Sequence, residues 1–411
     1  MIPTARPAVA LALIALLALA IPPWLSVALV LVVLAATVAD GWMVRTSPSV
    51  QRSIPGVVSR GARVKLSVAA ATDGRRVALR QPPGDQLQVM GAEGFAALRG
   101  SVTATKRGLR TLPGVASASI GPLGLARVHH RATAPADIRV LPDVAGARRL
   151  IIRLQRTQAG LTGGRARGPL GLGTEFESVR DYTTDDDIRA LNWRASARLD
   201  RPMSNQYRVE RDRDVICLID CGRLMAAPVG NGSTVLDLAL DAMTVLALAA
   251  DEVGDRFGAV VFDDAVRRVL APRHRGGAAA VQALFDLESR PVDSDFESAL
   301  THVARMRRAV VFVFTDLLDE AAARSLTIGV VVIARRHSAH VVSLADPAIE
   351  ELAANESMPA RALAALQVLS ARGAAALALR RAGARVLEAP ADRLAERCLD
   401  AYLTAKLRAR I

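Results

Sequence analysis

An uncharged apolar run close to the first residue limits the fold more than any other feature of the chain. Residues 8–39 contain no Asp, Glu, Lys or Arg, and Pro22 and Pro23 divide the run. One straight helix over these residues would extend about 48 Å at 1.5 Å per residue, against roughly 30 Å for the hydrocarbon core of a bilayer. We therefore expect residues 1–46 to form a transmembrane hairpin of two helices, each of about 15 residues, with Trp24 at the membrane interface.

The charges that flank this run predict its orientation. Arg6 precedes it, and Arg45 and Arg52 follow it. Because positive residues favour the cytoplasmic side of a membrane, both ends of the hairpin should be cytoplasmic. The expected protein is a multi-pass protein of the cell membrane, with the bulk of its chain in the cytoplasm. A single tilted span and a cleaved signal sequence are the alternatives. No A-x-A site leads directly into a polar chain, which argues against the signal sequence.

Residues 47–145 change to short alternating runs with turn residues between them, which is typical of a small β-sandwich. The predicted strands are 62–70, 75–80, 100–105, 115–120, 125–132 and 137–140. This part of the chain is also strongly basic. Residues 41–139 carry 15 Lys and Arg against 4 Asp and Glu, an excess of 11 within a net charge of +13 for the whole chain.

Next to a membrane anchor, this basic excess favours contact with anionic membrane lipid, at about 1 kcal/mol for each well-placed basic residue. Nucleic acid is the rival partner, but it would call for aromatic residues among the basic ones. The segment has only Trp42 and Phe95, so we expect no nucleic acid. A solvated surface without a partner is the third interpretation.

Residues 213–411 alternate between apolar strands and periodic helices, which predicts an α/β domain with a doubly wound, mostly parallel sheet. The predicted strands are 214–220, 257–262, 266–270, 309–315, 340–344 and 385–388, and the predicted helices are 234–253, 277–289, 295–306, 319–335, 361–382 and 391–408. Ligands of such sheets bind at the carboxyl ends of the strands. Two acids stand there, Asp220 and Asp316. The three cysteines, Cys217, Cys221 and Cys398, are expected to be buried thiols.

Residues 146–212 contain an unusual concentration of Gly, acids, Arg and one Trp. The segment reads G-L-G-T-E-F-E-S-V-R-D-Y over 171–182 and D-D-I-R-A-L-N-W-R-A-S-A-R over 186–198. It resembles the signature of the bacterial DUF58 family, with Asn192 where the family often has Asp. Thr184 or Asp185 could cap a short helix whose inward face includes Ile188, Leu191 and Trp193. Two roles are open for this segment, an ion-paired clasp between domains or a partner-binding surface, and the candidate residues are Gly171, Gly173, Glu175, Arg180, Asp186, Arg189, Trp193, Arg194 and Arg198.

The DUF58 resemblance also implies that residues 213–411 form a von Willebrand factor A-like domain. Such domains commonly hold a divalent ion with D-x-S-x-S after the first strand, a Thr on a middle loop and an Asp after the fourth strand. Here the first element reads D-C-G-R-L over 220–224, so that both serines are replaced. The ligands that remain are Asp220, Ser294 and Asp316. This degenerate site requires no cofactor, although weak Mg²⁺ binding stays open; the alternative is that Arg223 neutralises the carboxylates.

Known catalytic patterns do not occur in this sequence. It has no G-x-x-x-x-G-K-[ST], no H-E-x-x-H and no G-x-S-x-G, so we expect a protein that is not an enzyme. Proteins of the DUF58 family are typically encoded with MoxR-type AAA+ ATPases, and the resemblance implies an adaptor or chaperone-like protein that works with such an ATPase. The alternative is a metal-dependent enzyme of the cell envelope that uses the acids of the signature.

Overall fold

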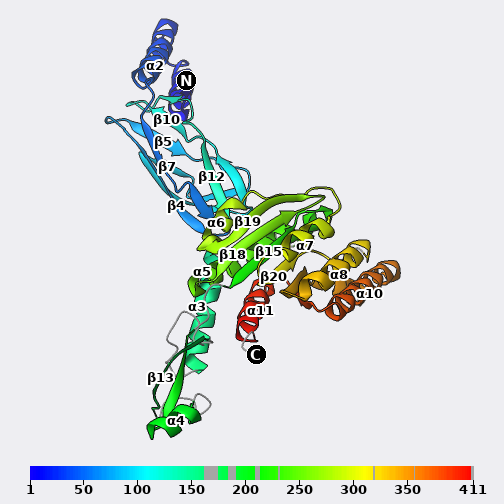
Figure 1. Cartoon of the computed structure of the whole chain (residues 1–411). Coiled ribbons are helices and arrows are strands. Elements are labelled where there is room, and N and C mark those ends of the chain that lie inside the picture. The colour runs from blue at the N-terminus through cyan, green and yellow to red at the C-terminus, as the bar shows by residue number, and fades with distance from the viewer. Residues whose placement is uncertain are drawn as a thin grey trace. The chain divides into compact units, whose positions relative to one another are not determined.

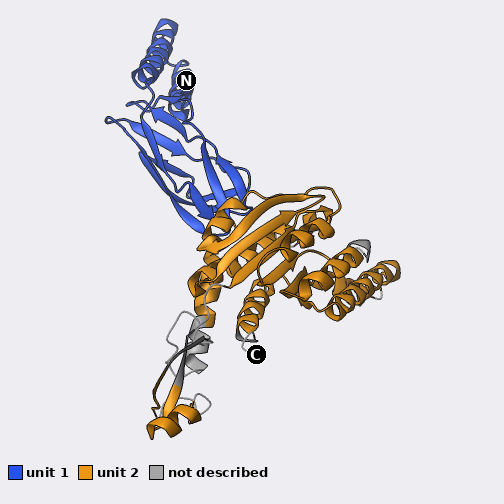
Figure 2. Ribbon diagram, in the orientation of Figure 1, with its two compact units in different colours: residues 1–141 blue, residues 142–411 orange. Residues whose placement is uncertain are grey.

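The computed structural model describes residues 1–161, 175–183, 191–208, 213–229, 232–317, 320–355 and 357–408. The chain divides into two compact units, residues 1–141 and 142–411 (Figure 2). The first unit contains the apolar N-terminal helices together with the predicted β-domain. The second contains the signature segment together with the predicted α/β domain.

The apolar run forms two helices, α1 (Ala5–Leu17) and α2 (Pro23–Met43) (Figure 1). Helix α2 is long and apolar enough to cross a membrane, because its 21 residues extend about 31 Å. Helix α1 has 13 residues and extends only about 20 Å, which is short of the roughly 30 Å core. The structure therefore supports an apolar anchor, and it does not support the expected second complete span.

Both ends of this helix pair are fixed to one segment of the β-domain. Strand β1 (Ile2–Pro3) pairs with β11 (Ala126–His129), and the Thr4 amide donates to the Leu125 carbonyl at 2.9 Å. Near the end of α2, the carboxylate of Asp40 is 1% exposed. It accepts hydrogen bonds from the amides of Leu123 (2.8 Å), Leu125 (2.8 Å) and Ala126 (3.0 Å). A buried carboxylate needs such donors, so Asp40 holds α2 to the β-domain.

The β-domain of the first unit is built from three sheets around a shared core. The sheet orders among the described residues are β2-β4-β8-β6, β1-β11-β10-β5-β7 and β3-β12-β9. Alternate side chains of these strands, among them Leu66, Val77, Leu98 and Ile138, form one buried cluster. The remaining bounds are β2 (Val50–Ser53), β3 (Val57–Ser59), β4 (Arg63–Ala70), β5 (Arg76–Arg80), β6 (Leu87–Met90), β7 (Glu93–Phe95), β8 (Ala97–Ala104), β9 (Gly108–Leu112), β10 (Ala116–Ile120) and β12 (Ala136–Leu141). The prediction of a β-rich domain is confirmed, and all six predicted strands are present.

The second unit is organised around a sheet of six described strands in the order β19-β18-β15-β20-β21-β22. Strand β19 is antiparallel to β18, and the other neighbours are parallel. The bounds are β15 (Asp214–Asp220), β18 (Arg256–Phe262), β19 (Val266–His274), β20 (Ala309–Phe314), β21 (Ser338–Leu344) and β22 (Arg385–Ala389). The mixed α/β class and the mostly parallel sheet are confirmed. The chain order reverses at β15, which has β18 on one side and β20 on the other, and such a position is where α/β sheets bind ligands.

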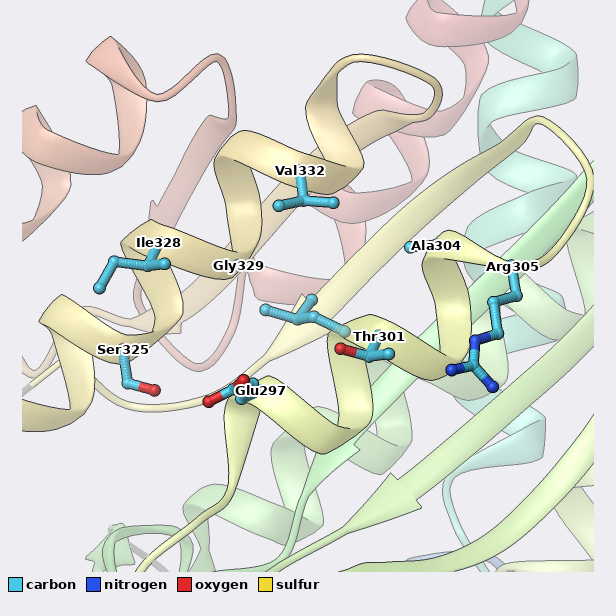
Figure 3. Close-up of a pocket in the computed structure, with 9 residues that line it drawn as sticks. Glu297, Thr301, Ala304, Arg305, Ser325, Ile328, Gly329 and Val332 are labelled. Carbon is cyan, nitrogen blue, oxygen red and sulfur yellow. The ribbon is translucent and has the colours of Figure 1, made fainter.

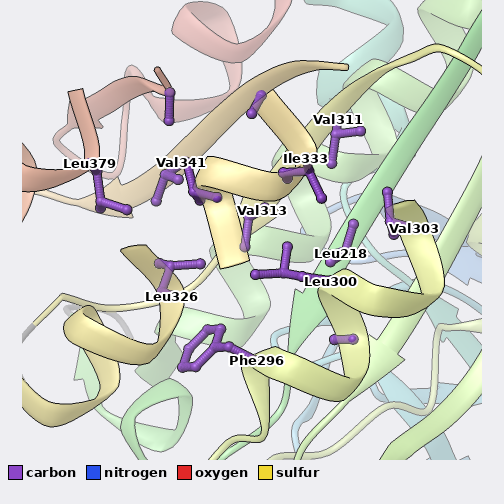
Figure 4. Close-up of a cluster of buried hydrophobic side chains, with 14 of the residues drawn as sticks. Leu218, Phe296, Leu300, Val303, Val311, Val313, Leu326, Ile333, Val341 and Leu379 are labelled. Atoms are coloured by element: carbon purple, nitrogen blue, oxygen red, sulfur yellow. The ribbon is translucent and has the colours of Figure 1, made fainter. Parts of the chain in front are cut away.

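Helices cover this sheet. A cluster of buried side chains joins β15, β20 and β21 to α7 (Phe296–Ala304), α8 (Glu320–Ala334) and α10 (Pro359–Arg381) (Figure 4). Helix α5 (Val235–Val253) packs on β15 and β18, and it begins with a capping box in which Thr234 and Asp237 bond to each other's main chain. The further helices are α3 (Val144–Leu161), α6 (Gly276–Ala283), α9 (Pro347–Ala353) and α11 (Leu394–Arg408). All three cysteines are free and buried, as predicted.

Candidate functional site

Three buried aspartates gather where parallel strands of the second unit end. Asp220 is the last residue of β15, Asp263 comes directly after β18, and Asp316 is the second residue after β20. Their exposed fractions are 2%, 1% and 3%. The carboxyl ends of neighbouring parallel strands meet at one edge of a sheet. Each acid reaches this edge for the same reason: it stands at the end of a buried apolar strand, and the strand ends at the edge of the sheet.

The Asp220 carboxylate is fully engaged by donors. One oxygen accepts from the Gly222 amide at 2.8 Å and from the Ser294 hydroxyl at 2.5 Å. The other accepts from the Thr315 hydroxyl at 2.7 Å. The structure thus brings together two of the three predicted ligands, Asp220 and Ser294. Gly222 is required by this close approach, because a Cβ at residue 222 would lie 2.1 Å from the Ser294 hydroxyl oxygen.

Asp316 is paired with an arginine that the sequence analysis did not identify. The Nη2 atom of Arg372, on α10, lies 2.8 Å from Asp316 Oδ1, and the two side chains are 10% and 3% exposed. The Nη1 atom of Arg372 donates to the Leu344 carbonyl at 3.2 Å, at the end of β21. Arg223, the residue expected to neutralise the site, forms an exposed ion pair with Asp293 at 2.5 Å. The neutralising arginine at Asp316 is therefore Arg372.

The third acid, Asp263, has its own cations. Arg267 lies 2.6 Å from one of its oxygens and Arg290 lies 3.1 Å from the other. Both arginines also reach Asp264, at 2.5 Å and 3.4 Å respectively. These three aspartates are thus satisfied by hydroxyl, amide or guanidinium groups of the described part of the chain.

Burial dominates the electrostatics of two of the three acids, Asp220 and Asp316. Burial raises the pKa of Asp220, although hydrogen bonds from Ser294, Thr315 and Gly222 oppose the rise. Burial also raises the pKa of Asp316, against the opposing charge and hydrogen bond of Arg372. The negative charge of Asp220 adds to the rise at Asp316. These carboxylates are costly to ionise without a cation close by.

The donor set does not fit a divalent ion. Mg²⁺ requires a near-octahedral set of oxygen ligands, but Asp316 is held by the Arg372 guanidinium. Gly222 and Leu224 supply no side-chain oxygen where the motif has serines. Within the described ranges, no group of three His, Cys, Asp or Glu is arranged to hold a metal ion.

The signature segment forms a hairpin with a short helix in the second unit. Strands β13 (Glu175–Asp181) and β14 (Met203–Arg208) pair antiparallel, with Glu175 opposite Arg208 and Arg180 opposite Ser204. Between them, α4 (Trp193–Leu199) is capped by Asn192, whose side chain accepts from the Ala195 amide at 2.9 Å. The predicted helix start at residues 184–185 lies outside the described residues, as do Gly171, Gly173, Asp186, Arg189 and Ile188.

Four candidates of this segment, Arg180, Trp193, Arg194 and Arg198, lie on its surface. Trp193 is 73% exposed, so the expectation that it faces inward is wrong. Arg180, Arg194 and Arg198 are also exposed. The reason is that α4 is short and contains no buried residue. The hydroxyl of Ser196, also on α4, accepts from the Met203 amide at 2.8 Å and thereby ties the helix to β14.

One ion pair of the hairpin joins Arg201 to Asp181 at 3.1 Å, and both side chains are largely exposed. Such a pair contributes little to stability. The clasp between domains therefore stays a prediction, and the exposed Trp193 favours the alternative role of partner binding.

A groove between α7 and α8 lies apart from these acids. It has a volume of about 410 Å³ and is lined mainly by small and apolar side chains, among them Leu300, Ile328 and Val332 (Figure 3). Glu297 and Arg305 also line it. Its lining suits packing against an apolar surface rather than the binding of an ion.

Together these features define a protein of mixed α/β class in which an apolar helix pair and a β-domain precede a mostly parallel sheet with buried acids at its strand ends. Residues 178–361 match the family described as "Protein of unknown function DUF58". This part of the chain belongs to the DUF58 family. The matched residues include α4 and the strands β15 to β21, whereas Arg372 follows the matched range.

Solved structures resemble parts of the chain only remotely. A cohesin module of a family 33 glycoside hydrolase from Clostridium perfringens is 10% identical, with 23% of this chain and 97% of that chain covered and a TM-score of 0.17. An uncharacterised membrane-spanning protein from Vibrio fischeri is 13% identical, with 48% and 98% covered and a TM-score of 0.19. A family 39 glycoside hydrolase from Bacteroides cellulosilyticus is 12% identical, with 72% and 50% covered and a TM-score of 0.18. At such scores the likenesses carry no argument. Among curated proteins, none matches the sequence significantly.

Proposed function

We propose that this protein is a membrane-anchored, chaperone-like adaptor that works with a MoxR-type AAA+ ATPase through a degenerate von Willebrand A-like domain. The strand order of the second unit supports this assignment, because Asp220 and Asp316 stand at the ends of adjacent parallel strands beside the reversal of chain order. The apolar helix α2 supports the membrane anchor. The ATPase is proposed as the partner because the resemblance to the DUF58 family implies such a partner, as described above.

The observation that carries the proposal is the exposure of Trp193. A large aromatic side chain with 73% of its surface exposed contributes little to packing among the described residues of this unit. Tryptophan is enriched among the few residues that supply most of the binding energy at protein interfaces. Arg194 and Arg198 follow it on α4 and are also exposed, and arginine is enriched at interfaces in the same way. Helix α4 is therefore the contact that we assign to the ATPase.

The test is binding of the purified, detergent-solubilised chain to a purified MoxR-type AAA+ ATPase from the same cells. We expect Trp193→Ala to weaken binding by at least about 30-fold, which corresponds to the roughly 2 kcal/mol of an interface hot spot. The unfolding temperature should stay unchanged, because the ring is exposed. A matched control is Phe95→Ala, which removes an exposed aromatic side chain of the first unit and should bind like the wild type.

Two results would count against the proposal. The first is a wild-type chain that does not bind the ATPase. The second is a folded Trp193→Ala variant that binds as tightly as the wild type, because α4 would then not be the contact.

A further inference from the structure

Arg372, which neutralises Asp316, lies in a stretch of α10 that is otherwise uncharged. Between Arg361 and Arg380, α10 contains one charged residue, Arg372. It lies on the buried face of the helix, at 8% exposure, together with Ala375, Ala376 and Leu379. Arginine is almost never buried without a partner. The partner is Asp316, which is 56 residues distant in the sequence.

We propose that the Arg372 guanidinium is the permanent built-in cation of the strand-end site, so that this domain holds its buried carboxylates without a divalent metal ion. The guanidinium is fixed at two points, Asp316 Oδ1 at 2.8 Å and the Leu344 carbonyl at 3.2 Å. Both contacts are buried, so solvent ions cannot easily replace it. A buried carboxylate must be paired or else protonated, and Arg372 meets that need at Asp316.

The contacts of Asp220 also support a site that needs no metal ion. Ser294 and Thr315 direct their hydroxyl groups to Asp220. Gly222 contributes a main-chain amide, which is a donor and cannot be a ligand to a cation. Asp220 is thus stabilised by hydrogen-bond donors and Asp316 by a guanidinium. Groups of the chain itself thus satisfy both carboxylates, by neutral donors at Asp220 and by a guanidinium at Asp316, and the inference does not depend on the ATPase proposed above.

The experiment compares the response of the detergent-solubilised full-length chain and two variants to millimolar Mn²⁺, a stand-in for Mg²⁺ that can be followed by electron paramagnetic resonance. Arg372→Met removes the charge and keeps an apolar side chain of similar length. Arg380→Met is the control on the same helix, because the Arg380 side chain is 53% exposed and 3.9 Å from Glu388. Bound Mn²⁺ and the unfolding temperature are measured for each.

We expect the wild type and Arg380→Met to bind no Mn²⁺ below millimolar concentration and to show no shift in unfolding temperature. We expect Arg372→Met to unfold at a lower temperature at neutral pH, because Asp316 has lost its counter-ion. Mn²⁺ should then bind the variant and restore part of the loss, since a ligand that binds only the folded state stabilises it. If Arg372→Met does not fold, adding Asp316→Asn should restore folding, because the uncompensated charge is removed.

Three outcomes would overturn the proposal. One is a wild-type chain that binds Mn²⁺ at micromolar concentration and loses this binding in Asp316→Ala. Another is an Arg372→Met variant that is as stable as the wild type and does not respond to Mn²⁺. The third is an Arg372→Met variant that stays unfolded when Asp316→Asn is added, which would assign Arg372 a role in packing instead of charge balance.

Discussion

At the scale of single residues, His340 makes the second unit sensitive to acid. Its ring lies on β21 with no exposed surface and stacks on Phe312, with ring centroids 4.8 Å apart. Burial, together with the charge of Arg385, lowers the pKa of His340 to about 4. Because this value is below that of the unfolded chain, His340 contributes stability above pH 6.5 that is lost as the pH falls toward 4. The loss amounts to roughly 3 kcal/mol.

His340→Phe should therefore flatten the fall in stability between pH 6.5 and 4, since a phenyl ring can stack on Phe312 and takes up no proton. Urea unfolding at a series of pH values measures this slope. His302→Phe is the control, because His302 is exposed on α7 and the slope should remain that of the wild type. An unchanged slope in His340→Phe would show that other groups bind the protons.

The residues of the strand-end site were only partly predictable. Asp220 and Asp316 were found because an acid follows each buried strand, and Ser294 was found from its motif position. Arg372 was missed because its pairing with Asp316 depends on how α10 packs, which local patterns do not define. One signal was nevertheless present, a single arginine in a long uncharged helical stretch, because a buried arginine requires an acidic partner.

At the scale of elements, long strands and helices were predicted well and short ones were not. The six strands of the large sheet in the second unit were each placed within a few residues, because central strands such as β15 and β20 are apolar runs. Strands β13 and β14 of the signature segment alternate with polar residues and were not predicted. Strands β3 and β7 have three residues each, too few to show alternation. Helix α3 was missed although apolar residues recur at helical spacing, with Ala147 and Ile151 buried. Its arginines belong to a region that was interpreted as part of the charged signature segment.

One sheet of the first unit has a basic outer face that fits the contact with anionic lipid expected from the sequence. Arg63 and Lys65 on β4 and Arg99 on β8 are exposed. In the strand register, Arg99 lies opposite Ser67, two residues beyond Lys65, so that all three basic side chains lie on one face. Three basic residues at about 1 kcal/mol each would contribute roughly 3 kcal/mol to lipid contact.

A dye attached to Ser67→Cys reports on this face, because Ser67 is exposed and the native cysteines are buried. In nanodiscs, its emission should shift to the blue with anionic lipid but not with zwitterionic lipid. Changing Arg63, Lys65 and Arg99 to Gln should abolish the shift, as should high salt. A dye on Ser370→Cys of α10 is the control and should not respond. A shift that persists in the Gln variant would exclude this face.

At the scale of the whole molecule, the helix pair defines which parts of the chain share a side of the membrane. Thr4 and Asp40 are both bound to residues 123–126 of the same unit. With the proposed membrane anchor, we therefore expect the chain to enter the membrane and return to the side from which it came. With α1 extending about 20 Å, the turn around Leu19 should remain inside the bilayer.

Cysteine labelling tests this topology in intact cells and inverted vesicles. Leu19→Cys places a thiol at the turn, where the native side chain is 90% exposed in the isolated chain. We expect a membrane-impermeant maleimide to leave it unlabelled from both sides, and reporter fusions after Thr46 and at Ile411 to indicate the cytoplasm. Thr72→Cys, in the first unit, is the control that should react from the cytoplasmic side. Labelling of residue 19 from the outer side would instead show two complete spans.

The hydrogen bonds that hold the helix pair to the β-domain also predict the order of membrane insertion and folding during synthesis. Thr4 and Asp40 pair with groups that are 83 to 121 residues later in the chain. The apolar helices therefore leave the ribosome long before strand β11, which completes their binding site. During that interval the segment of the β-domain that binds them has not been made, and the bilayer is the environment that can bury their apolar surface. Membrane insertion of the helices should accordingly precede the folding of the β-domain, which then forms its hydrogen bonds to helices that are already inserted.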